Sequence, residues 1–208
     1  MTMSDLSDND LWLMNYYRSG EIKGALFFGR VARIVRGPLQ VDVTHHFADE
    51  AAHAHYWTQC LDDLGFSPSR ETKGYQDQYL DAVGLPANLM EVMAITLIFE
   101  KRAIRLYNQH LRARPHPRIC QTIDTIMRDE RWHVKYVRDA LREMGVKYGD
   151  EAISATIARY QAADDEIYAK TLAEHGERMR FLVPSDRPVE FSAQHAIMEA
   201  LPDGERNV

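Results

Sequence analysis

The sequence predicts an all-α protein: a four-helix bundle with a long crossover between its second and third helices and an additional C-terminal helix. Apolar residues recur at intervals of three and four over long segments, and no stretch alternates apolar and polar residues as a strand would. With 208 residues, the chain is long enough for one domain with a substantial core. We therefore expect a single helical domain over residues 1–183, with the core bundle at 9–145, and an irregular tail over 184–208.

The first two predicted helices form a hairpin. Apolar residues keep a helical spacing over residues 9–36, which defines the first helix. Gly37 and Pro38 then break it, because glycine ends a helix at little cost and proline begins the next one well. The second helix should follow at once and end near Gly65.

A crossover should separate this hairpin from the next. Residues 66–85 contain Pro68, Gly74 and Gly84 and leave room only for a short helix at residues 76–83. The connection is therefore too long for a tight turn.

The second half of the chain is predicted to form another hairpin and one more helix. The third helix should run from Pro86 to about residue 112, and the fourth should end at Gly145. The Pro-His-Pro sequence at residues 115–117 forces the turn between them. A fifth amphipathic segment covers residues 151–178.

Composition and charge narrow the class of protein. A hydrophobic content of 45% with 27% charged residues is typical of soluble domains, and no apolar run approaches the ~20 residues of a membrane span. The acidic, polar N-terminus does not resemble a secretory signal, so we expect a cytoplasmic location. A net charge of −6 argues against nucleic-acid binding. Cys60 and Cys120 are isolated and are interpreted as reduced thiols.

Both hairpins carry, in their second arm, an acidic pair followed by a histidine. The two copies are Asp49-Glu50-x-x-His53 and Asp129-Glu130-x-x-His133. A glutamate and a histidine three residues apart lie on the same face of a helix, so each copy can offer both side chains to one metal ion. Two copies indicate two metals.

The first arms should supply two further glutamates, because a dinuclear site in such a bundle also needs one from each of the other helices. The candidates are Glu21 and Glu100. In a helical hairpin, residues equidistant from the turn face each other, since the rise per residue is the same on both arms. Glu21 and Glu50 are centred on the Gly-Pro break, and Glu100 and Glu130 are centred on Pro115. Each pair should therefore meet across its own turn.

This ligand set resembles that of the ferritin-like di-iron carboxylate superfamily, which includes rubrerythrins, bacterioferritins, ribonucleotide reductase small subunits, multicomponent monooxygenases and aldehyde-deformylating oxygenases. The six residues are Glu21, Glu50, His53, Glu100, Glu130 and His133. The resemblance covers about residues 9–145 and implies a ferritin-like bundle that holds two iron ions. The same ligands suit manganese or a mixed pair. Either the second-arm or the first-arm glutamates bridge the metals.

Four further residues are expected to support the ligands: Asp49, Asp129, Tyr17 and His46. Ligating histidines commonly donate their other N–H to a carboxylate, and each aspartate directly precedes a ligand glutamate. Tyr17 and His46 each lie one turn before a ligand, where a hydrogen-bonding role competes with simple packing. For Tyr107 and Tyr136, we favour core tyrosines with satisfied hydroxyls over a redox role.

The functional prediction is a non-haem di-iron oxidase or oxygenase that uses O₂ to oxidise a small, fairly apolar substrate. No four-cysteine module is present, so electrons should come from a separate donor. Most of a set of apolar residues near the ligands should be core, and some could line a substrate cavity. The set is Phe28, Met93, Leu97, Phe99, Ile104, Met127 and Val137. The alternatives are a ferroxidase or iron-storage protein and a tRNA hydroxylase, which the acidic charge disfavours. The sequence is compatible with a homodimer.

Overall fold

The part of the chain described by the computed structural model, residues 6–69, 75–113 and 115–179, is all-helical, which confirms the predicted class. The helices are α1 (Asp8–Ile34), α2 (Leu39–Asp63), α3 (Tyr75–Val83), α4 (Leu89–Arg112), α5 (Pro117–Tyr148) and α6 (Asp150–Met179). The tail predicted at 184–208 lies outside the described residues.

Two helix boundaries differ from the prediction because of local capping. The third helix was expected to begin at Pro86, but α4 begins at Leu89, because the Asn88 side chain caps it by accepting a hydrogen bond from the backbone N–H of Glu91. The fourth was expected to end at Gly145, but α5 continues to Tyr148. It ends before Gly149, whose φ of 81° only glycine adopts readily.

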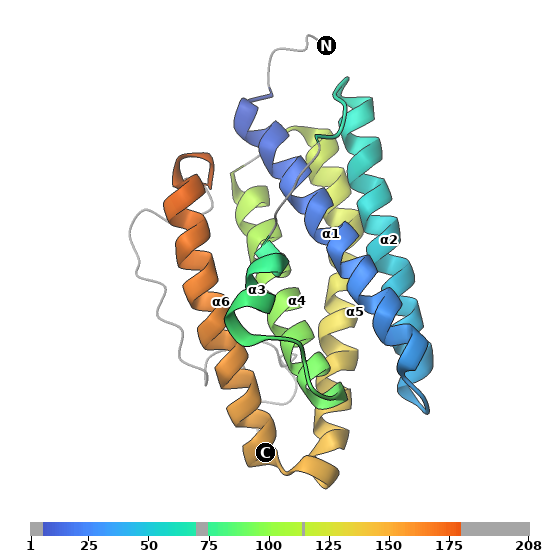
Figure 1. Ribbon diagram of the computed structural model, residues 1–208. Helices are drawn as coiled ribbons and strands as arrows, with labels where there is room; N and C mark the ends of the chain where they lie inside the picture. Colours follow the sequence, from blue (N-terminus) through green and yellow to red (C-terminus); the bar gives the residue numbers. More distant parts are fainter. Residues whose placement is uncertain (1–5, 70–74, 114, 180–208) are drawn as a thin grey trace, which may run out of the picture.

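The bundle consists of two antiparallel hairpins. Helix α1 packs along α2 and α4 packs along α5, while α2 also contacts α5. The α1–α2 turn and the α4–α5 turn lie at opposite ends of the bundle (Figure 1). Helix α2 therefore ends and α4 begins at opposite ends of the bundle, and α3 lies between them in the chain (Figure 1).

Helix α6 packs along α4, and α3 packs against α6 and α1. A buried ion pair and a hydrogen bond to the same carboxylate join the three. Arg102 on α4 donates two hydrogen bonds to Asp164 on α6, and the Tyr79 hydroxyl on α3 donates to the same carboxylate. The guanidinium also lies 3.9 Å from the centre of the Tyr168 ring. Removing one partner of such a buried pair costs about 3–5 kcal/mol. These contacts hold α3 in place beside α1, where it forms one wall of a cavity.

The hydrophobic core consists of two clusters. One contains residues such as Phe28, Val43 and Val137, and the other contains Leu13 and Ile123 among others. Along each of the four bundle helices, the predicted metal ligand lies between residues of one cluster and residues of the other. The ligands are therefore held at mid-height of the bundle and are shielded from water at both ends.

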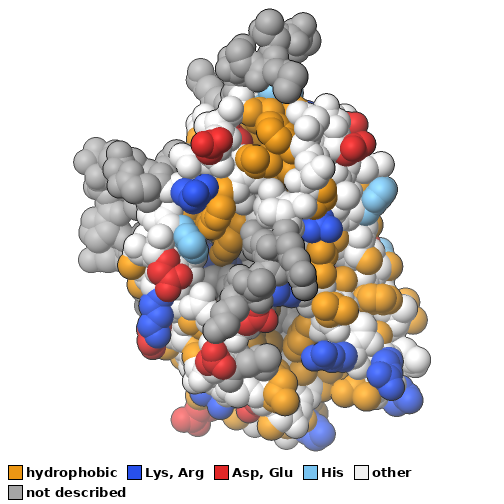
Figure 2. Space-filling view, turned by 45° about the horizontal axis from the view of Figure 1, so that its top comes forward, with side chains coloured by type: hydrophobic (Ala, Val, Ile, Leu, Met, Phe, Trp, Pro, Cys, Tyr) orange, Lys and Arg blue, Asp and Glu red, His pale blue; other side chains and the backbone are white. Residues whose placement is uncertain are grey.

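The described surface is mixed in character. Lys and Arg side chains lie singly or in small groups among acidic and hydrophobic ones on the face drawn in Figure 2. Among the described helices, none is both long enough and apolar enough to span a bilayer.

Candidate metal centre

The structure brings all six predicted ligands together at the centre of the bundle, and each is at most 7% exposed. Their potential ligand atoms form two groups within which every atom lies within 4.8 Å of the others. The groups are His46, Glu50, Glu100 and His133, and Glu21, Glu50, His53 and Glu130. Two neighbouring positions for a cation result, and Glu50 belongs to both.

The second-arm glutamates lie between the two positions. The Oε1 atom of Glu130 is 3.4 Å from Nδ1 of His53, and its Oε2 atom is 3.4 Å from Nδ1 of His133. One carboxylate thus directs an oxygen to each side. Glu50 is the other shared carboxylate.

The first-arm glutamates each lie on one side. Glu21 places Oε2 3.4 Å from Nδ1 of His53, and Glu100 places Oε2 3.6 Å from Nδ1 of His133. Of the two arrangements that the sequence left open, this geometry favours Glu50 and Glu130 as the bridging pair.

The two aspartates contact the histidines across the hairpins. Asp49 lies 3.1 Å from Nε2 of His133, and Asp129 lies 3.1 Å from Nε2 of His53. Each aspartate therefore orients the ring of the opposite hairpin and leaves Nδ1 directed toward the carboxylates. The Asp49 side chain is 17% exposed and that of Asp129 is 41% exposed, so the two contacts are unequally shielded.

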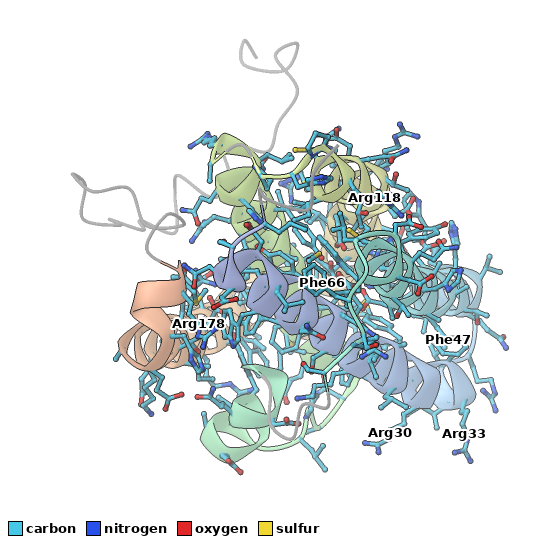
Figure 3. All side chains as sticks on the ribbon, turned by 90° about the horizontal axis from the view of Figure 1, so that it is seen from above. Arg30, Arg33, Phe47, Phe66, Arg118 and Arg178 are labelled. Carbon is cyan, nitrogen blue, oxygen red and sulfur yellow. The ribbon has the colours of Figure 1, made fainter. Side chains whose placement is uncertain are left out.

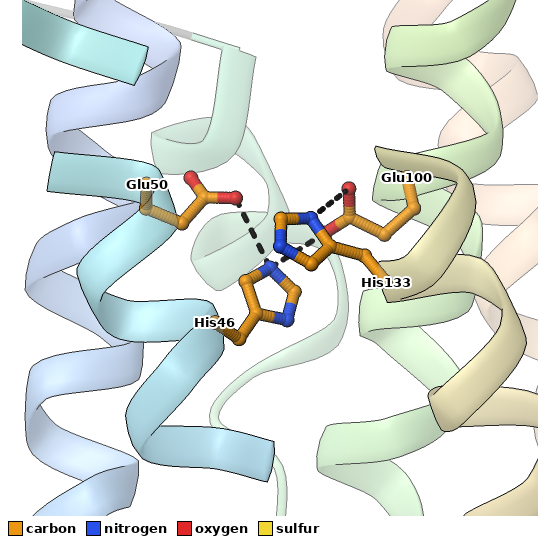
Figure 4. Close-up of side chains that lie close together, drawn as sticks. All are labelled: His46, Glu50, Glu100 and His133. Carbon is orange, nitrogen blue, oxygen red and sulfur yellow. Dashed lines mark hydrogen bonds and ion pairs between the residues drawn. The ribbon is translucent and has the colours of Figure 1, made fainter. Parts of the chain in front are cut away.

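His46 lies inside the centre and not beside it. Its Nε2 atom is 3.1 Å from Oε1 of Glu50 and 3.2 Å from Oε1 of Glu100, as Figure 4 shows. Its Nδ1 atom is 2.7 Å from the Tyr136 hydroxyl, and the ring is fully buried. The sequence placed His46 near the ligands, but the structure gives it the same access to the carboxylates as a predicted ligand has.

A tyrosine also contacts a carboxylate of the other group. The Tyr107 hydroxyl donates a hydrogen bond to Oε1 of Glu21 and accepts one from the indole N–H of Trp57. Tyr17, which was expected to support Glu21, instead packs its ring on Tyr107, and its hydroxyl has no hydrogen-bond partner among the described residues. Tyr107 therefore makes the contact that the sequence assigned to Tyr17.

The pKa values of the buried groups describe how the negative charge of the four carboxylates is balanced. Burial and the neighbouring carboxylates raise the pKa of Glu50 and Glu100 well above the ordinary value. Burial alone would raise the pKa of Glu130, but contacts from Glu100 and both histidines hold it well below the ordinary value. Burial alone would lower the pKa of His53 and His133, yet the surrounding carboxylates raise both. In the absence of a cation, protons on these groups balance the buried negative charge.

Two observations indicate that these carboxylates and imidazoles are suited to bind metal ions. Nδ1 of His53 is buried and has no hydrogen-bond partner among the described residues, although it faces two carboxylates. At Gly24, one turn after Glu21, a Cβ atom would lie 1.8 Å from Oε2 of Glu50. The glycine therefore leaves the space that this shared carboxylate occupies. Carboxylates and imidazoles are suitable ligands for iron and manganese.

A cavity of about 320 Å³ reaches the centre between α1 and α4. The Glu21, Glu50, Glu100 and Glu130 side chains form its inner end. Apolar residues of α1 and α4 form most of its walls, and α3 and residues 84–86 contribute to the rest. Arg30, at the outer rim, points away from the bundle (Figure 3).

Most of the seven candidate cavity residues belong to the hydrophobic core, as expected from the sequence. Of the seven, only Phe28 and Phe99 line the cavity, and the other five pack into the hydrophobic clusters. Gly24 was not among the residues expected from the sequence, and no local pattern singles it out, because the same helix also contains Gly20 and Gly29.

Comparisons with family models, with curated proteins and with solved structures return no match to this chain. The function must therefore be inferred from the geometry of the centre and its cavity.

Proposed function

We propose that this protein is a non-haem di-iron oxidase or oxygenase with a ferritin-like bundle. The observation that carries the proposal is the meeting of four glutamates and two histidines at a buried site that opens into a cavity. Two of these carboxylates lie between the two groups of potential ligand atoms. When bound, two ferrous ions would each supply one electron for the reduction of O₂. Glu50 and Glu130 would bridge the ions, with Glu21 and Glu100 as terminal ligands.

The cavity favours a small organic substrate over iron alone. Its volume of about 320 Å³ is at the lower end of the range typical for small-molecule sites, and its walls are mainly apolar. A substrate in this cavity would contact Phe27, Phe28 and Phe99 and would approach the carboxylates directly. The apolar walls would bind the substrate and exclude bulk water from the centre.

The decisive experiment is anaerobic loading of the purified protein with Fe(II), followed by exposure to O₂ with and without small apolar alcohols, aldehydes and aromatic compounds. We expect two irons per chain and a rate of O₂ consumption that depends on one class of compound. The matched control is Glu130→Gln, which keeps the side-chain volume but removes the negative charge.

The outcome also separates the alternative of ferroxidase and storage. Storage predicts that O₂ uptake is the same with every compound. It also predicts that iron accumulates far above two per chain in an assembly that is large on size-exclusion chromatography. These two results together would contradict the oxygenase proposal and support storage. Failure to bind iron at all would remove both functions.

A further inference from the structure

The two hairpins correspond residue by residue around the centre. Glu21 corresponds to Glu100, and the two Asp-Glu-x-x-His segments correspond to each other. His46 lies four residues before Glu50, and the residue four positions before Glu130 is Ile126. Both positions are fully buried, but only one carries a group that can bind a metal. The centre is therefore asymmetric in its nitrogen donors.

We propose, on the basis of the di-metal function above, that His46 is a seventh protein ligand and that the two metals are held unequally. One ion would have the imidazoles of His46 and His133, with Glu100 as its terminal carboxylate. The other would have the single imidazole of His53, with Glu21.

The distances at His46 support ligation. Two ligand atoms that each lie about 2.1 Å from one octahedral ion, on adjacent corners, are roughly 3 Å apart. The Nε2 atom of His46 lies 3.1 Å from Oε1 of Glu50 and 3.2 Å from Oε1 of Glu100. These separations are shorter than those from Nδ1 of His133 to its carboxylates, which are 3.4 and 3.6 Å.

The ring of His46 is also fixed as a ligand ring should be. Its second nitrogen is 2.7 Å from the Tyr136 hydroxyl, a contact that selects the ring orientation. Its two faces stack on Phe28 and His133, with ring centres 3.7 and 3.6 Å apart (Figure 4 shows the histidine pair). The side chain therefore needs no rearrangement to present Nε2 to an ion between Glu50 and Glu100.

The consequence is an order of binding. Imidazole is a better ligand for iron than for the harder manganese ion, which prefers carboxylates and water. The position with two imidazoles should fill first with Fe(II).

The test uses Mn(II) alone on metal-free, full-length protein. Calorimetric titration of the wild type, His46→Leu and Ile126→Leu measures the two dissociation constants. We expect one of the two constants of His46→Leu to rise by about tenfold to 100-fold, while Ile126→Leu matches the wild type. Two unchanged constants in His46→Leu would overturn the seventh ligand but leave the di-metal proposal intact.

A spectroscopic measurement keeps the proposal testable if His46→Leu does not fold. Pulsed EPR of wild-type protein with one equivalent of Mn(II), and with ¹⁵N-labelled histidine for comparison, counts the coordinated imidazoles. Couplings from two imidazoles are expected, and a single imidazole at each Mn(II) would overturn the proposal. Absence of any Mn(II) and Fe(II) uptake by the wild type would contradict the proposed function itself.

Discussion

The two halves of the candidate metal centre share the same types of predicted ligand but have different surroundings. The half around Glu21 and His53 has Tyr107 as a hydrogen-bond donor to its terminal glutamate. In the half around Glu100 and His133, the position corresponding to Tyr107 is Phe28, which cannot donate a hydrogen bond. That half has His46 instead, whose ring stacks on Phe28.

Under the proposed function, this difference would allow a near-symmetric scaffold to hold two metals unequally. In one half, a tyrosine hydroxyl draws electron density from a terminal carboxylate through a hydrogen bond. In the other, an imidazole adds a nitrogen donor. We expect the two positions to differ in affinity, and variants of corresponding residues test this expectation.

The largest effect is expected from comparing a shared glutamate with a terminal one. Glu130→Gln should lower the affinity for both metals on the order of 100-fold, because the two carboxylate oxygens of Glu130 face both histidines. Glu21→Gln should lower the affinity for one metal only, because Glu21 faces His53 alone. Metal analysis after dialysis measures the occupancy: below about one metal per chain for the first variant and about one for the second. Equal losses in the two variants would contradict the assignment of Glu130 as shared.

A smaller effect is expected at Gly24. In Gly24→Ala, the new methyl group would lie 1.8 Å from Oε2 of Glu50, so this shared carboxylate must move. We expect both dissociation constants for Mn(II) to rise by about tenfold.

Gly29→Ala is the matched control on the same helix. The atoms nearest to its Cβ would belong to the Phe47 ring, the first at 3.2 Å, and this side chain is 38% exposed and can move aside. Metal affinity should stay at the wild-type value. A loss of affinity in this variant equal to that of Gly24→Ala would point to general disturbance of the helix.

The aspartates allow the two halves to be disturbed separately. Asp49→Asn should lower the affinity for the metal at His133, and Asp129→Asn should lower the affinity for the metal at His53. Each dissociation constant should rise by up to about tenfold. We expect the larger effect from Asp49, because it is the less exposed of the two. Calorimetric titration checks this order, and a larger effect from Asp129→Asn would reverse our ranking of the two contacts.

The smallest effect is expected at the tyrosine. Tyr107→Phe removes the donor to Glu21 and leaves the Trp57 N–H without its acceptor, so the free energy of unfolding should fall by about 1–2 kcal/mol. Urea unfolding of the metal-free protein measures this change. Metal occupancy should remain at two per chain, and loss of one metal would show that Tyr107 does more than support Glu21.

The all-helical bundle and the meeting of the six candidate ligands could be predicted from the sequence, because both depend on spacing along helices. Period and turn position determine which residues share a face and which face each other across a hairpin, and this was enough to bring Glu21 to Glu50 and Glu100 to Glu130. Helix ends that depend on a capping side chain were predicted less accurately: α4 begins at Leu89, after the cap Asn88, and not at Pro86.

The rest of the centre could not be predicted, because it depends on how the hairpins rotate against each other. The position of Nε2 of His46 between Glu50 and Glu100 requires a particular packing of α2 against α4 and α5. The same holds for the hydrogen bond from Tyr107 to Glu21, which joins α4 to α1. No local pattern contains this information.

The exchange of aspartates between the hairpins has a consequence for assembly. Since Asp49 orients His133 and Asp129 orients His53, neither hairpin can complete its own half of the centre. A partly synthesised chain that has released only α1 and α2 would carry the candidate ligands of these two helices but no aspartate to orient His53. The donors and orienting aspartates of both positions are therefore complete only after the hairpins dock. Under the proposed function, tight metal binding would wait for that step and would be withheld from chains that have not finished folding.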